Sequence, residues 1–232
     1  MSAKTLFSRI FRAAAAVGAG AGPLGWTAAP TQAFAGGTTT SCSGEATVVR
    51  GAFSNSLGLA PVTISDTGPL PSSGGALQAS LIAEDFAGML SVHVCPAATI
   101  GQDDDVHSEA SCADLNLTPG PGNIIQADAL FAKAQASCCT DPSVSGPADI
   151  ANLVVNGTPV TVSGQPNQTV SIVGGEVVIN EQNISQDSDS ASITANALRV
   201  IINGAPSAPT DPTQPDIIHE NSTNNGIEGI LL

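Results

Sequence analysis

The sequence has few aromatic residues and few cations. It contains no tyrosine, a single tryptophan, and six Lys and Arg residues against 20 Asp and Glu residues. A surface with this charge balance repels nucleic-acid phosphates and anionic lipid headgroups, which argues against either as a partner. Faces that stack on sugars or anchor protein partners depend on Trp and Tyr, so the composition also argues against stacking recognition.

The cations are concentrated at the N-terminus, which predicts a secretory signal peptide over residues 1–35. Residues 1–12 are basic and contain no acid, an Ala- and Gly-rich stretch follows, and the triplet AFA at 33–35 forms a small-x-small cleavage site. Cleavage near Ala35 leaves 197 residues with three cations and 20 acids, a net charge of −17. We therefore expect a protein that is secreted or held at the cell envelope. Since no later apolar run reaches about 18 residues, we expect no membrane span.

Export changes the interpretation of the five cysteines. In an oxidising compartment they are expected to form disulfides rather than metal or catalytic sites. Cys95 and Cys112 bracket a polar loop of 16 residues, and closing it would stabilise the fold by about 3 kcal/mol on the chain-entropy model. Cys42 could then pair with Cys138, or with Cys139 beside it.

Hydrophobic residues after the leader recur with a period of two, which is typical of β-strands. In GMLSVHVC (88–95), Leu90, Val92 and Val94 share one face and Cys95 lies on the other. Turn signals recur between strand-sized units. The pattern predicts an all-β fold with a single antiparallel β-sandwich, jelly-roll-like or a flattened barrel, over residues 36–202. A β-solenoid is the alternative. A Pro-rich excursion at 203–216, then a short last strand and polar tail at 217–232, complete the expected organisation.

Two hairpins are expected. Asn156-Gly157 suits a two-residue turn in which both residues need positive φ, and Pro159 in the following strand indicates an edge position. Gly174-Gly175 is expected to turn the second hairpin.

Two segments leave alternatives open. In 191–202 the apolar residues change parity, so that either both faces are covered or a bulge near 197–198 resets the register. Residues 124–139 fit both a helix face and strand alternation, and the residues themselves slightly favour helix.

Clustered acids are candidates for a calcium site. Calcium takes six to eight oxygen ligands, usually from a flexible loop, but neither cluster has EF-hand spacing. The alternative interpretation is a solvated acidic loop. The candidates lie in two loops: Asp103, Asp104, Asp105 and Glu109 in one, and Asp187 and Asp189 in the other.

Catalytic motifs are absent from the sequence. It has no nucleophile elbow, phosphate-binding loop, HExxH or GxGxxG motif, and His93, His107 and His219 are widely separated. We therefore expect no enzymatic activity and no required cofactor. Arg199 interrupts an apolar run and is expected to pair with Glu181 as a structural tie.

Several motifs between residues 45 and 202 are similar to those of bacterial exported proteins of the choice-of-anchor P family. They are NLVVNG (152–157), QPNQTVSI (165–172), VVINEQ (177–182) and ITANALRV (193–200), preceded by GAFSNSLGL (51–59) and DTGPLP (66–71). The resemblance implies an exported, strand-rich protein without an established activity, and it favours strand for 124–139. The C-terminal residues HENSTNNGIEGILL contain no hydrophobic span or basic tail, which favours free secretion and leaves retention on a surface open.

Three functions follow as hypotheses. The first is a non-catalytic, structural or adhesive protein of the cell envelope or extracellular space, with cell-surface or matrix components as partners. The second is a calcium- or small-ligand-binding extracellular module. The third is a secreted hydrolase, which would need two carboxylates across a sugar cleft.

Overall fold

The computed structural model describes most of the chain after residue 42. All described residues belong to one compact unit, residues 41–232. The expected signal peptide lies outside them, as does all but the first residue of the Pro-rich excursion. For 52–61 and 226–229 the backbone alone is described. The described ranges are 43–55, 58–71, 73–86, 88–102, 104–120, 122–137, 142–186, 191–203 and 226–229.

The described residues form strands and no helix, so the all-β prediction is confirmed. The strands are β1 (Thr47–Asn55), β2 (Gly58–Asp66), β3 (Gly75–Phe86), β4 (Leu90–Gln102), β5 (Asp105–Gly120), β6 (Asn123–Ser137), β7 (Ser143–Ser145), β8 (Ala148–Ala151), β9 (Val154–Val155), β10 (Thr158–Pro159), β11 (Gln168–Ile172), β12 (Gly175–Gln186), β13 (Ala191–Asn203) and β14 (Gly226–Gly229).

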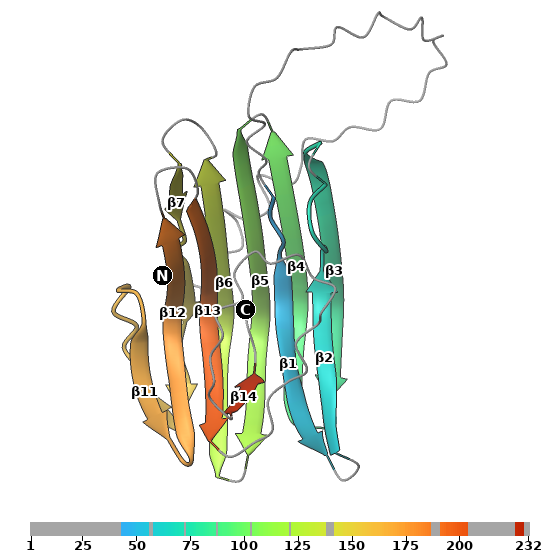
Figure 1. Cartoon of the computed structure of the whole chain (residues 1–232). Coiled ribbons are helices and arrows are strands. Elements are labelled where there is room, and N and C mark those ends of the chain that lie inside the picture. Colours follow the sequence, from blue (N-terminus) through green and yellow to red (C-terminus); the bar gives the residue numbers. More distant parts are fainter. Residues whose placement is uncertain are drawn as a thin grey trace, which may run out of the picture. The chain divides into compact units, whose positions relative to one another are not determined.

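The described strands form antiparallel sheets arranged as a β-sandwich, and none of these sheets closes into a barrel. One sheet has the order β10-β9-β6-β5-β4-β3, with β7 and β8 also paired to β6. The second has the order β11-β12-β13-β14, and β1-β2 form a separate pair whose β1 lies beside β14. Figure 1 shows β1, β2, β12 and β13 overlying β3–β6, and β13 packs against β6 while β1 packs against β4 and β5.

Aliphatic side chains fill the space between the two layers, as the scarcity of aromatic residues predicts. Leu90, Ile125 and Leu130 from the larger sheet are fully buried with Ile179 and Leu198 from the opposite layer. Alternation on strands directs these side chains inward. Burial of each contributes about 1.5–3 kcal/mol relative to exposure.

Residues 124–139, for which the residues themselves slightly favour helix, form β6 over Asn123–Ser137. Even-numbered residues at its start are exposed and odd-numbered residues are buried. β6 lies between β5 and the short strands β7–β9, so its backbone is hydrogen-bonded along both edges. Pairing on both edges overrides the intrinsic helix preference of its alanines.

The expected face of β4 is wrong beyond Val92. Val94 is 41% exposed whereas Cys95 is fully buried. The β4–β5 register shifts on either side of His93, and Val94 has φ of 47°. A bulge therefore reverses the parity of the strand, which is how one strand presents Leu90 and Val92, and then Cys95, to the same core.

The two hairpin predictions have different outcomes. Asn156 and Gly157 have φ of 51° and 76° and connect β9 to β10, as expected, and Pro159 lies in the edge strand β10. The second turn is shifted by one residue from the expected place. Ile172 pairs with Gly175, so Val173 and Gly174 form the loop, and Gly174 provides the positive φ of 68°.

The β12–β13 ladder contains no inserted residue near 197–198, so the proposed register shift is wrong. The register is the same from Gly175 with Ile202 to Gln186 with Ala191, and only Asn180, with φ of 51°, and Ala197 drop out of the ladder. The consecutive residues Asn196, Ala197 and Leu198 are all buried. Both faces of this segment are therefore covered, which was the alternative.

Candidate functional site

The disulfide between Cys95 of β4 and Cys112 of β5 is present. Both residues are fully buried and belong to the hydrophobic core. The bulge at Val94 turns Cys95 inward, toward the face that Cys112 occupies. Cys42 and Cys138, the other expected pair, lie outside the described residues.

The first acidic cluster is only partly described. Asp104 and Asp105 are exposed at the turn between β4 and β5, and Asp103 lies outside the described residues. Glu109 points elsewhere, because its Oε1 lies 3.2 Å from Nζ of Lys133 on the neighbouring strand β6. The described acids of this loop are therefore not gathered around one point.

The second cluster, Asp187 and Asp189, falls entirely outside the described residues. Within the described part of the chain, no three His, Cys, Asp or Glu side chains lie together in a way that could hold a metal ion. Because Asp103, Asp187 and Asp189 lie outside the described residues, the calcium site stays a prediction.

The two described histidines have separate surroundings. His93 is half-exposed on the outer face of β4, with Nδ1 3.8 Å from Oδ2 of the exposed Asp114. His107 Nδ1 lies 2.7 Å from Nε2 of Gln135. They lie on adjacent strands at different levels, since β4–β5 pairing places His93 opposite Ala113 and His107 opposite Ile100.

Glu181 and Arg199 form an ion pair on the β12–β13 ladder. Nη1 of Arg199 donates to Oε1 of Glu181 at 2.7 Å, and the side chains are only 20% and 8% exposed. Nδ2 of Asn196 donates to the other carboxylate oxygen at 2.6 Å. Asn196 is the cross-strand neighbour of Glu181, and sequence reasoning missed its role because the pairing register was unknown.

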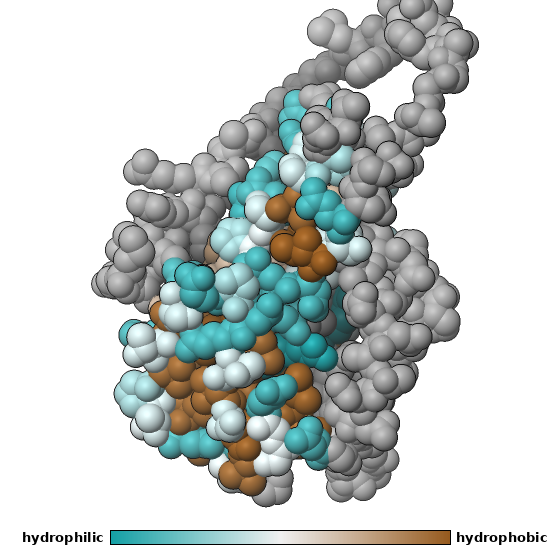
Figure 2. Space-filling model, turned by 60° about the vertical axis from the view of Figure 1, so that its left-hand side comes forward, coloured by the Kyte–Doolittle hydropathy of each residue, from teal (hydrophilic) through white to brown (hydrophobic). Residues whose placement is uncertain are grey.

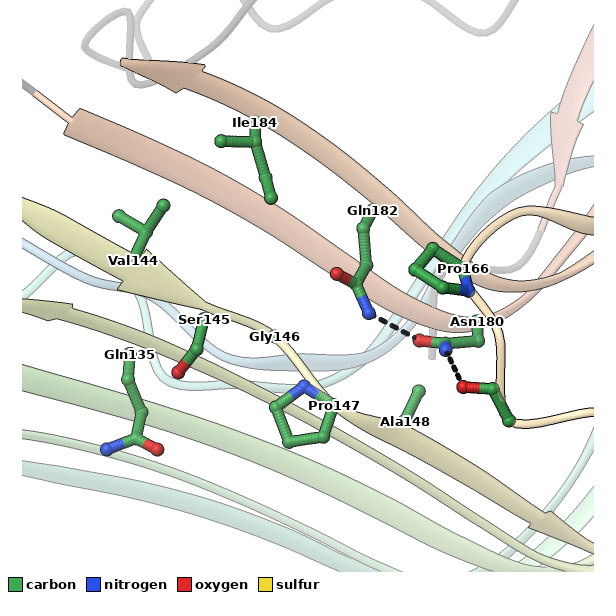
Figure 3. Close-up of a pocket in the computed structure, with 11 residues that line it drawn as sticks. Gln135, Val144, Ser145, Gly146, Pro147, Ala148, Pro166, Asn180, Gln182 and Ile184 are labelled. Atoms are coloured by element: carbon green, nitrogen blue, oxygen red, sulfur yellow. Dashed lines mark hydrogen bonds between the residues drawn. The ribbon is translucent and has the colours of Figure 1, made fainter. Parts of the chain in front are cut away.

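A shallow depression of about 530 Å³ lies at the border where β7 and β8 approach β12 (Figure 3). Its polar side chains are mainly amides. Nδ2 of Asn180 donates to the carbonyl of Gly164 at 3.3 Å, and Nε2 of Gln182 donates to Oδ1 of Asn180 at 2.9 Å. The lining residues are Gln135, Val144, Ser145, Gly146, Pro147, Ala148, Gly164, Pro166, Asn180, Gln182 and Ile184.

Gln182 donates to Asn180, Asn180 donates to the backbone of Gly164, and Gln135 pairs with His107, so each of these amides has a partner within the fold. Asn180 and Gln182 follow a Val-Val-Ile run, a position typical of the end of a strand, but β12 continues to Gln186.

Figure 2 shows that this side of the molecule carries two apolar areas separated by a hydrophilic band. Among the exposed aliphatic residues, Ile184 is 55% exposed and lines the depression.

Comparisons of the chain with family models, with curated protein sequences and with solved structures return no match. The similarity to the choice-of-anchor P family therefore stays a hypothesis. The described residues contain no helix that is long and apolar enough to cross a membrane.

Proposed function

We propose that this chain is an exported, non-catalytic β-sandwich protein with a structural or adhesive role at the cell envelope or in the extracellular space. The observation that carries the proposal is the buried disulfide between Cys95 and Cys112. Disulfides persist in oxidising compartments and are rare in reducing cytosol. The basic leader expected at residues 1–35 supports the same location.

The structural role in this proposal is supported by the ion pairs that the charged side chains of the sandwich form. Each cation of the described residues pairs with an acid: Arg50 with Glu45 and Asp66, Lys133 with Glu109, and Arg199 with Glu181. These pairs join neighbouring strands or strand ends. The charges thus serve the fold, and the acidic remainder of the surface favours solubility.

Mass spectrometry of the released protein tests the location. We expect a mature N-terminus close to Gly36 and a Cys95–Cys112 linked peptide without prior reduction. A Met1 peptide in the released fraction would contradict cleavage. Alkylation of both cysteines in the unfolded, unreduced protein would contradict the disulfide.

Cell fractionation separates the envelope role from free secretion. A structural or adhesive protein of the envelope is expected to remain with washed cells and to rebind to cells that lack the gene. Recovery of all protein in the medium, with no rebinding, would exclude the envelope role and leave an extracellular one.

A further inference from the structure

The lateral borders of the sandwich differ in how their edge strands are protected. A free strand edge can pair with another chain, and prolines and short length are common protections. β2 contains Pro61, β10 contains Pro159, and the five-residue β11 follows Pro166. β3 is 12 residues long, contains no proline or lysine, and ends the order of its sheet in the described structure (Figure 1).

The same strand leaves apolar surface incompletely covered. Leu77, Ala79 and Leu81 alternate as half-buried residues, and Ala79 and Leu81 pack against the core. Ile82 is 83% exposed. Another strand added along β3 would extend both the sheet and the core beneath it, which is how β-augmentation gains affinity and specificity.

The sequence of β3 complements itself. Residues 76–82 read ALQASLI and contain no charge. In an antiparallel pairing centred on Ala79, Leu77 faces Leu81 on the inner face, and Gln78 faces Ser80 on the outer face. Directly opposed residues of this kind are the unit of sheet stabilisation.

The acids of β3 do not oppose this pairing locally. Glu84 and Asp85 lie beyond the seven uncharged residues. With the centre at Ala79, they fall beside Gly74 and Ser73 of the other copy rather than beside acids. Like charges directly opposite each other would destabilise the pair, so this register avoids the one local repulsion that β3 could generate.

We propose that β3 pairs with β3 of a second copy of this chain, antiparallel and centred on Ala79, so that two sandwiches share one continuous sheet. The occupant is a second copy because the edge is complementary to itself and lacks the cations that an acidic partner would require. Two-fold pairing uses the same surface on both copies and therefore closes as a dimer. The proposal does not depend on export.

Charge placed on exposed residues tests both the edge and the register, because position 78 of each copy faces position 80 of the other. The variant Gln78→Glu with Ser80→Glu places two carboxylates opposite each other at both of these contacts. The variant Gln78→Lys with Ser80→Glu places opposite charges there instead. Both original side chains are exposed, so neither variant should disturb folding, which circular dichroism checks.

Sedimentation equilibrium of the purified full chain measures the outcome. We expect a concentration-dependent dimer for the natural sequence. The Glu–Glu variant should raise the dissociation constant about tenfold or more, and the Lys–Glu variant should lower it relative to the Glu–Glu variant by at least that factor.

A cross-link fixes the register independently. Ala79 faces its own copy across the two-fold axis, where opposed Cα atoms lie about 4.5–5.5 Å apart and a disulfide can form. Ala79→Cys should give a covalent dimer whose linked peptide contains residue 79 twice. Ala83→Cys is the matched control, because the two copies of residue 83 would lie roughly 26 Å apart.

Three results would overturn the proposal. One is a monomer at every concentration, including a monomer whose β3 amides are protected by another part of the chain. A second is a dimer that responds equally to both charge variants, which would place the interface elsewhere. The third is a cross-link at residue 83 that is as efficient as that at residue 79.

Discussion

The two arginines of the described structure make the same chemical pair in different surroundings. Arg199 of β13 binds Glu181 of β12 within the second sheet, and both side chains are largely buried. Arg50 of β1 binds Glu45 and Asp66 at one end of the β1–β2 pair, where Arg50 is 36%, Asp66 32% and Glu45 18% exposed. The hydroxyl of Thr47 connects this second group by accepting from Arg50 at 3.0 Å and donating to Asp66 at 3.1 Å.

The difference shows that burial, rather than the identity of the two residues, decides how much an ion pair contributes to the free energy of unfolding. A buried charge that loses its partner keeps its desolvation penalty, whereas an exposed one is rehydrated. The carboxylate of Glu181 also receives Asn196 on its second oxygen, so its acceptors are satisfied from two positions of the same strand. The β12–β13 ladder should therefore depend on its pair far more than the β1–β2 ladder does.

The largest expected effect is that of Arg199→Ala. It leaves Glu181 buried without its cation, and should lower the free energy of unfolding by about 3 kcal/mol. Urea unfolding measures the change. Replacing Arg199 by Met together with Glu181 by Gln should recover most of the loss, because no charge then stays buried. An unchanged melting temperature for Arg199→Ala would contradict a buried tie.

Asn196→Ala should have an intermediate effect. Removing the amide that donates to Oε2 of Glu181 should cost about 1.5–3 kcal/mol, the range for hydrogen bonds to charged groups. Combined with Arg199→Ala, the loss should be less than additive because both side chains act on one carboxylate. The exposed Asn183 of β12 provides the control, and equal losses for Asn183→Ala and Asn196→Ala would refute the assignment.

Arg50→Ala should have the smallest effect, about 1 kcal/mol, because Arg50 and Asp66 are about one third exposed and their charges are solvated and screened. Raising sodium chloride from about 0.05 M to about 1 M should reduce even this contribution while leaving that of Arg199 nearly unchanged. The measurement is a set of urea unfolding curves at both salt concentrations. A loss at Arg50 that matches that at Arg199 would remove the distinction between the two regions.

The fold class was predictable because strand alternation and turn residues are local signals. Asn156-Gly157 marks its turn, since both residues tolerate positive φ. Which face of a strand is buried was less predictable. The bulge at Val94 has no sequence signature, because valine is a poor residue for positive φ, and it changes which of Val94 and Cys95 is buried. Segment 124–139 shows the same limit, since sheet pairing overrides local preference there.

Sequence reasoning found the candidate residues that pair with each other, the two cysteines and the buried ion pair, because each pair has one strong chemical requirement. Cys95 and Cys112 were expected to pair across a loop, and they do pair, although the residues between them form the adjoining parts of β4 and β5. Arg199 needed an acid because it interrupts an apolar run. Asn196 and the amides beside β7 were not found. Their contacts depend on cross-strand register and on the approach of β12 to β7 and β8, which no local pattern contains.

The sequence by itself determined that the chain folds as an acidic, aromatic-poor β-protein with an aliphatic core, because composition and a period of two are properties of neighbouring residues. Only the tertiary structure decided that Glu181 lies buried between Arg199 and Asn196, and that β3 is the last strand of its sheet among the described residues. Register and strand order bring together residues that are far apart in the chain. Burial then determines whether the same ion pair is essential or dispensable.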